Sequence, residues 1–147
     1  MVAEDAPGVL PETENERLVV AFLDEWGPTY DVFRNAYDRY MTDDVLWENT
    51  GFPTVAGKHE AMGFLDQLRV IWGMEYCSYQ LLGIASRGDK VFTERIDKVH
   101  GPDGAVKMTF KIMGAFDIRD GKIARYSDHF DAGVVRDAHQ VSAAAGG

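Results

Sequence analysis

Cysteine is nearly absent from this 147-residue chain, which contains Cys77 and no other. A single thiol excludes an intramolecular disulfide and any metal site built from several cysteines. The four histidines show no close metal-ligand spacing, and no H-E-x-x-H pattern occurs. The glycines follow neither the G-x-G-x-x-G nor the P-loop order. We therefore expect no metal, no nucleotide and no other cofactor.

Positive charge is also scarce, because 15 basic residues stand against 24 acidic ones and the formal net charge is −9. Nucleic acid and anionic lipid both bind to basic surfaces, so neither is expected as a partner. No apolar run approaches the roughly 20 residues that a membrane span requires. The acidic, proline-containing start of the chain does not have the order of a signal peptide. These absences predict a cytoplasmic protein.

The chain does contain enough apolar sequence for one folded domain, with 46% hydrophobic and 12% aromatic residues. We expect a flexible leader at 1–11, a single domain over 12–141 and a flexible tail at 142–147. In the first half of the domain, apolar residues recur at three- and four-residue spacing, which predicts three helices. They run from Glu12 to the Gly27-Pro28 pair, over 29–40 and over 58–73.

After Met74 the pattern changes to that of strands separated by short turns rich in glycine and aspartate. One earlier strand is also expected, directly after a turn at 41–44. The expected strands are 45–49, 75–86, 90–100, 105–118 and 122–131. Helices followed by an antiparallel meander make an α+β layout.

One of these strands carries two charges on an apolar face. Val91 and Val99 make that face apolar at its two ends. Because strand side chains alternate between faces, Thr93, Arg95 and Asp97 share it. A buried Arg–Asp pair is costly unless the charges satisfy each other and a third group completes the network. A solvated face is the plainer alternative.

The last strand supplies a third group, because Asp128 is a lone carboxylate on a face with Tyr126 and Phe130. An arginine can hold two carboxylates in its planar fork. Burial raises the pKa of each acid and the shared Arg95 lowers both, so one acid can stay protonated while the other is ionised. Such a pair supplies the acid and the base that open a strained ether with water. Alternatively, the three charges only hold the sheet together.

An apolar wall is expected around these charges. In the strand that begins near 105 the even positions are apolar, and Gly114 among them allows a bend or a close approach. Trp47 and Tyr126 lie on inward faces of their own strands. The predicted substrate-binding residues are Trp47, Met108, Phe110, Ile112, Phe116 and Tyr126. Ordinary core packing is the alternative role for the same residues.

Three pieces of the chain resemble the limonene-1,2-epoxide hydrolase family. They are Thr93-Glu94-Arg95-Ile96-Asp97, Ser127-Asp128-His129-Phe130-Asp131 and Asn49. The resemblance runs from about Glu14 to Asp131. It implies the nuclear-transport-factor-2-like (SnoaL-like, cystatin-like) α+β barrel, a cone-shaped curved antiparallel sheet with three N-terminal helices packed on its concave side. It also implies a homodimer formed through the sheet.

The resemblance further implies that water opens an apolar epoxide directly to a vicinal diol, without a covalent enzyme intermediate and without a metal. Asp97 would protonate the epoxide oxygen, and Arg95 would bridge the two acids. Asp128 would take a proton from the attacking water, which Asn49 would help to hold.

One position departs from the family pattern. The family has a tyrosine two residues before Asn49, where this chain has Trp47. An indole N–H donates a hydrogen bond but cannot accept one, so the water loses a contact. The departure favours a second function, an isomerase, cyclase or lyase that acts on an apolar aromatic or polycyclic substrate with Asp128 as the proton acceptor. A third is a non-catalytic ligand-binding dimer module, by fold-level analogy.

Overall fold

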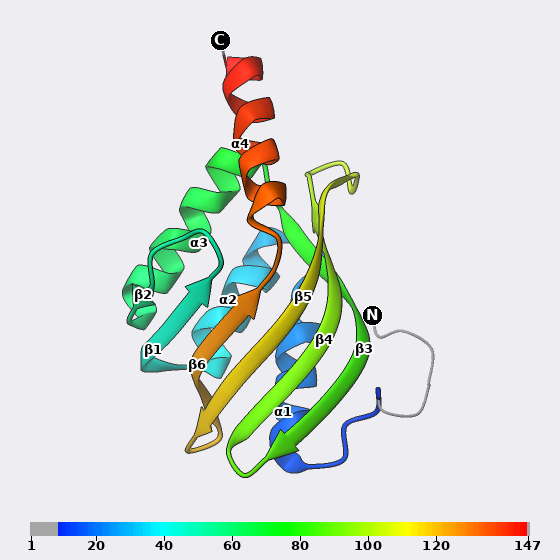
Figure 1. The fold of residues 1–147 in the computed structure, drawn as a ribbon. Coiled ribbons are helices and arrows are strands. Elements are labelled where there is room, and N and C mark those ends of the chain that lie inside the picture. Colours follow the sequence, from blue (N-terminus) through cyan, green and yellow to red (C-terminus); the bar gives the residue numbers. More distant parts are fainter. Residues whose placement is uncertain (1–8, 147) are drawn as a thin grey trace.

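The computed structural model describes residues 9–146, and the side chains of residues 9–139. A curved, open six-stranded sheet runs through it, with helices on one side (Figure 1). The helices are α1 (Glu14–Asp24), α2 (Tyr30–Tyr40), α3 (Lys58–Trp72) and α4 (Ala132–Gly146). The strands are β1 (Met41–Asn49), β2 (Val55–Ala56), β3 (Tyr76–Arg87), β4 (Lys90–His100), β5 (Val106–Arg119) and β6 (Lys122–His129). None of the described helices is both long and apolar enough to cross a membrane.

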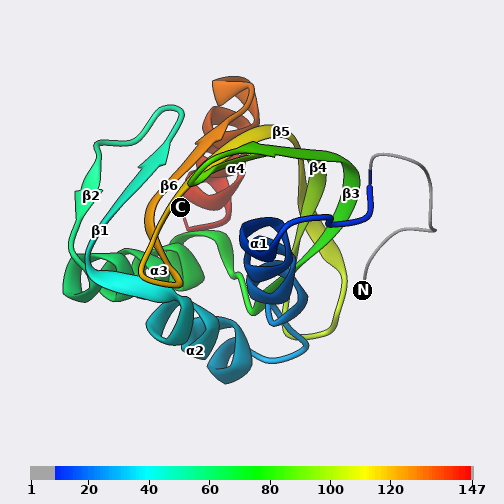
Figure 2. The same ribbon diagram turned by 90° about the horizontal axis from the view of Figure 1, so that it is seen from below.

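The sheet has the strand order β2-β1-β6-β5-β4-β3. Strands β3 to β6 form the antiparallel meander that the short turns predict. The sheet curves around α1, and α2 and α3 lie on the same concave side (Figure 2). The predicted α+β class and helix placement are therefore confirmed. The sheet is not wholly antiparallel, because β1 pairs with β6 in parallel.

The helices begin where side chains can cap them. Thr13 Oγ1 accepts a hydrogen bond from the backbone N–H of Glu16 at 3.1 Å, and Thr29 Oγ1 accepts one from Val32 at 3.3 Å. Each bond satisfies an N–H that has no partner within its helix. The capped helices cover the sheet with apolar side chains. One of these, Phe22, is fully buried. The concave face thus becomes a closed apolar interior.

Two boundaries differ from those predicted at the start of the domain. Strand β1 begins at Met41, where a turn was expected, because Met41 itself is fully buried and pairs with Ile123 of β6. Val9 falls in the predicted leader, yet it is only 4% exposed. Residues 1–8 of that leader lie outside the described residues.

The end of the chain differs more. The sequence reading placed no helix after Asp131 and assigned 142–147 to a tail, whereas α4 continues to Gly146. Val135 of α4 is 5% exposed, and the helix packs against α3 and β5. Contacts with distant parts of the chain therefore support this helix.

Candidate active site

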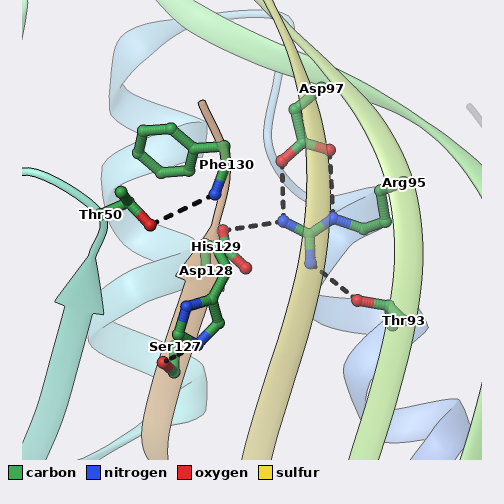
Figure 3. Close-up of polar contacts among 8 residues, drawn as sticks. All are labelled: Thr50, Thr93, Arg95, Asp97, Ser127, Asp128, His129 and Phe130. Atoms are coloured by element: carbon green, nitrogen blue, oxygen red, sulfur yellow. Dashed lines mark hydrogen bonds and ion pairs between the residues drawn. The ribbon is translucent and has the colours of Figure 1, made fainter. Parts of the chain in front are cut away.

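The three charged residues singled out by strand alternation meet on the concave face. Arg95 and Asp97 lie on β4, and Asp128 lies on β6, with β5 between the two strands. Arg95 Nε donates to Asp97 Oδ1 at 3.1 Å. Arg95 Nη2 donates to Asp97 Oδ2 and to Asp128 Oδ2, each at 2.8 Å (Figure 3). One nitrogen thus joins both carboxylates, in a site where Arg95 is 1%, Asp97 5% and Asp128 4% exposed.

Thr93 completes the coordination of the guanidinium. Its Oγ1 accepts a hydrogen bond from Arg95 Nη1 at 2.9 Å, and the residue is buried. All three guanidinium nitrogens therefore have fixed partners, which sets the plane of the Arg95 side chain. The alternation of β4 predicts that Thr93 lies on this face, but it does not predict the bond from Arg95 to its hydroxyl.

Gly114 provides the space through which Arg95 reaches Asp128. It is the Cα partner of Thr93 on one side and of Asp128 on the other. A Cβ at this position would lie 2.6 Å from Arg95 Nη1, 2.7 Å from Asp128 Oδ1 and 2.8 Å from Thr93 Oγ1. The close approach anticipated at Gly114 is thus the passage of the guanidinium over β5.

The electrostatics of the site favour one shared proton. One guanidinium faces two carboxylates, and an uncompensated charge is costly in a buried site. Burial raises the pKa of Asp97 against the lowering effect of Arg95, and the Asp128 carboxylate raises it further. These effects favour Asp97 as the place of a shared proton. Asp128 Oδ1 is buried and has no hydrogen-bond partner among the described residues.

A cavity of about 70 Å³ adjoins Asp97. Five further residues from the sequence prediction line it: Asn49, Trp47, Tyr126, Phe110 and Ile112. Arg95 and Asp128 are not part of its lining. Asp97 is therefore the carboxylic acid of the pair that borders the cavity.

Two predicted lining residues lie elsewhere. Met108 lines a groove between α3, β5 and α4, because β5 extends past the end of the cavity there. Phe116 is fully buried under the ring of Tyr126, with the two centroids 5.0 Å apart. It lies beyond Gly114, on the far side of the charged residues, and so is core rather than cavity lining.

The cavity lining also includes residues outside the predicted set. They include Tyr37 of α2, Trp26 and Cys77. Burial raises the pKa of the Cys77 thiol, and Asp97 raises it further, so the sulfur stays protonated. Among the described residues, no three His, Cys, Asp or Glu side chains are grouped so as to hold a metal ion.

Aromatic rings crowd one side of the cavity. Phe52 and Trp72 both line it, with ring centroids 6.1 Å apart. Helix α4 brings His139 against both rings, at 6.2 Å from Phe52 and 6.4 Å from Trp72. A ligand pocket usually holds about 300–1,000 Å³. The cavity of about 70 Å³ is therefore smaller than a usual ligand pocket.

The sequence matches the limonene-1,2-epoxide hydrolase catalytic domain over residues 13–139. Epoxide hydrolase EphG of Mycobacterium tuberculosis is 30% identical over 95 residues, which are 64% of this chain and 60% of that protein. The match thus spans less than two thirds of that relative. The structure of an LEH-like epoxide hydrolase from M. tuberculosis is similar at a TM-score of 0.67 and 26% identity, covering 90% of this chain and 93% of the other.

A SnoaL-like protein from Jannaschia has the same fold, at a TM-score of 0.69 and 19% identity, with 92% and 96% of the two chains covered. Likeness at that identity concerns the fold alone. The sequence match over most of the chain goes further, and the protein belongs to the limonene-1,2-epoxide hydrolase family.

Proposed function

We propose that this protein hydrolyses an apolar epoxide to a vicinal diol by direct attack of water. The observation that carries the proposal is the pair of 2.8 Å hydrogen bonds from Arg95 Nη2, one to each buried carboxylate. A single cation between two acids keeps one of them protonated and the other ionised, which is the combination that ring opening requires. Family membership and the function named for EphG support the same reaction.

The two acids take different roles because their surroundings differ. Asp97 borders the cavity and has a raised pKa, so it donates a proton to the epoxide oxygen as the C–O bond breaks. Asp128 keeps one oxygen without a partner in the described part of the chain, and this oxygen takes a proton from the water whose oxygen bonds to carbon. The reaction leaves Asp128 protonated and Asp97 ionised. Return of one proton from Asp128 to Asp97, through water, restores the starting state.

Asn49 is proposed to hold the attacking water together with Asp128. The two residues are Cα partners across the parallel β1–β6 pair, and Asn49 lines the cavity. Its side-chain oxygen can accept the second proton of a water molecule that donates the first to Asp128.

The lining of the cavity favours a small apolar substrate. Most of its residues are aromatic or aliphatic, and Asp97 is the only one of these described residues with a carboxyl group. An apolar molecule with one polar oxygen fits such a surface, because that oxygen meets Asp97 while the rest displaces water from carbon.

Diol formation from a panel of apolar epoxides tests the proposal. Asp97→Asn and Asp128→Asn keep the shape of each side chain and remove its acid or base, so each should lower kcat by about 100- to 10,000-fold. Asp44→Asn changes an exposed aspartate and is the matched control. Circular dichroism establishes that each variant is folded. Diol yields unaffected by either active-site change would remove the assignment.

A second candidate function is an isomerisation, cyclisation or elimination in which Asp128 removes a proton from the substrate. Trp47 favours it, because the indole N–H is buried without a hydrogen-bond partner in the described part of the chain and cannot accept a proton from water. Isotopically labelled water separates the two reactions. Hydrolysis puts the labelled oxygen into the product, and the second reaction does not.

A non-catalytic ligand-binding module is the third alternative. Exposed and separated charges at Arg95, Asp97 and Asp128 would favour it. Their side chains are instead 0%, 7% and 5% exposed and directly paired. This arrangement supports an enzyme over a plain binding module.

A further inference from the structure

Three aromatic rings form a row across the sheet, next to the row that contains Asp128. Tyr126 of β6 is the Cα partner of Trp47 on β1 and of Phe116 on β5. Its ring is parallel to both neighbours, at 5.9 Å and 4° from Trp47 and 5.0 Å and 10° from Phe116. Tyr126 is also two residues before Asp128, on the same face of β6. Within this row, Tyr126 alone carries a group that can both donate and accept a hydrogen bond.

Tyr126 shares the concave face of the sheet with the polar groups of the site. Burial raises the pKa of Tyr126, and the charge of Asp128 is the next largest cause of that rise. Both effects keep the phenol protonated, so that it retains an O–H to donate. The Tyr126 side chain also borders the cavity, which Asp128 does not.

Tyr37 is placed to hold the Tyr126 hydroxyl. The two rings are 6.3 Å apart, and a hydrogen bond from the Tyr126 hydroxyl is one of the causes that act on the pKa of Tyr37. Tyr37 comes from α2, so this bond ties the helix layer to β6 directly beside the cavity. Each hydroxyl can donate one bond and accept another. Rotation of both O–H groups reverses the bond, so that Tyr37 donates to the Tyr126 oxygen and leaves the Tyr126 proton free for another acceptor.

We propose that the Tyr126 hydroxyl is a third contact of the attacking water, alongside Asp128 and Asn49, and that Tyr37 orients that hydroxyl. The inference rests on the proposed hydrolysis and names a further group in its water site. The water donates its protons to Asp128 Oδ1 and Asn49, accepts one bond from Tyr126, and keeps its remaining lone pair for the epoxide carbon. Trp47 packs against the ring that performs this role and does not itself need to accept a bond.

Tyr126→Phe separates this role from core packing, because the ring and its stacking contacts are kept. Loss of the hydroxyl misplaces the water and should lower kcat on the order of 100-fold, while KM for the same epoxide changes little. Tyr30→Phe is the matched control. It removes the hydroxyl of another buried tyrosine, which is bonded to Asp66 at 2.5 Å and lies outside the cavity lining, and should leave kcat unchanged.

A double-mutant cycle tests the part assigned to Tyr37. If Tyr37 acts through Tyr126, Tyr37→Phe lowers kcat in the wild type but has little further effect in Tyr126→Phe. If the two single-variant losses of kcat multiply in the double variant, Tyr37 acts independently of Tyr126, and its orienting role is overturned. Wild-type kcat in Tyr126→Phe would overturn the role of Tyr126 and leave the hydrolysis itself standing.

A crystal structure of the wild type gives a readout that does not depend on turnover. We expect an ordered water bonded to Asp128 Oδ1, Asn49 and the Tyr126 hydroxyl, and its loss or displacement in Tyr126→Phe. A wild-type protein that converts no epoxide would remove the proposed function, yet the crystal water would still decide this inference. A water bonded to Asp128 that makes no bond to Tyr126 would contradict the inference.

Discussion

Arg95 reaches Asp128 only because Gly114 has no side chain: a Cβ at Gly114 would lie 2.6 Å from Arg95 Nη1. The guanidinium belongs to β4 and its second carboxylate to β6, so the arginine must cross the intervening strand. The atoms that crowd this point belong to buried side chains whose partners fix them, so they cannot move aside without breaking the ion network. The empty space at Gly114 is therefore as much a part of the site as the charges.

Gly114→Ala should lower the free energy of unfolding by about 1–3 kcal/mol through overpacking. It should also lower epoxide turnover on the order of 100-fold, because the acids lose their alignment. Urea denaturation and kcat measure the two effects. Gly63→Ala is the control: Gly63 is an exposed residue of α3, a Cβ there would meet nothing within 4 Å, and alanine should raise the free energy of unfolding by about 1 kcal/mol. Unchanged stability and turnover in Gly114→Ala would contradict this account.

Thr93 should matter through its oxygen rather than its shape. Thr93→Val keeps the volume but leaves Arg95 Nη1 without its acceptor in a buried site, which should cost about 1–3 kcal/mol of unfolding free energy. Thr93→Ser retains the acceptor and is the matched control. Denaturation curves for the two variants distinguish the roles. A serine variant as destabilised as the valine variant would point to the methyl group instead.

The sequence predicted most of the fold because its signals are local. The periodicity of the first three helices and the short turns between β3 and β6 each involve residues close together in the chain. Pairing β1 with β6 joins segments that lie far apart in the sequence, and no local pattern specifies it. Helix α4 was missed for a related reason, because its support comes from α3 and β5.

In the site, too, local patterns predicted some features, and others depend on distant parts of the chain. Strand alternation placed Arg95, Asp97 and Asp128 on inward faces, and the structure brings them together. Met108 obeys the same alternation yet misses the cavity, because alternation gives the face of a strand and not the position along it. Tyr37 was not recognised because a tyrosine within an apolar helical stripe resembles core until the neighbours of its hydroxyl are known.

The convex face of the sheet predicts a homodimer. Phe92 and Met113 lie there on adjacent strands, 44% and 58% exposed, and the helices cover the opposite face. Light scattering at micromolar concentration should give twice the 16.4 kDa mass of one chain. Met113→Asp puts a charge on that face and should give a monomer. Val70→Asp, at an 84% exposed position on α3, should leave the dimer intact. A monomeric wild type would contradict the prediction.

Asp97 should make stability fall as pH rises. Its pKa is raised by burial above the ordinary 3.8, so the folded protein binds this proton more tightly than the unfolded chain. The resulting stabilisation is fully present below the unfolded pKa and is lost as pH rises through the folded pKa. The side-chain amide of the Asp97→Asn variant mimics the protonated acid at every pH.

The unfolding free energy of Asp97→Asn relative to wild type should therefore increase with pH above about 4, as the wild-type acid ionises. Asp66→Asn provides a control of opposite sign, because hydrogen bonds from Arg34 and then Tyr30 lower the pKa of Asp66. Its contribution is present above the unfolded pKa and is lost in acid. Urea titrations at a series of pH values measure both differences. A difference for Asp97→Asn that stays constant or decreases with pH would show that Asp97 does not hold the shared proton, and the acid in the proposed reaction would have to be reassigned.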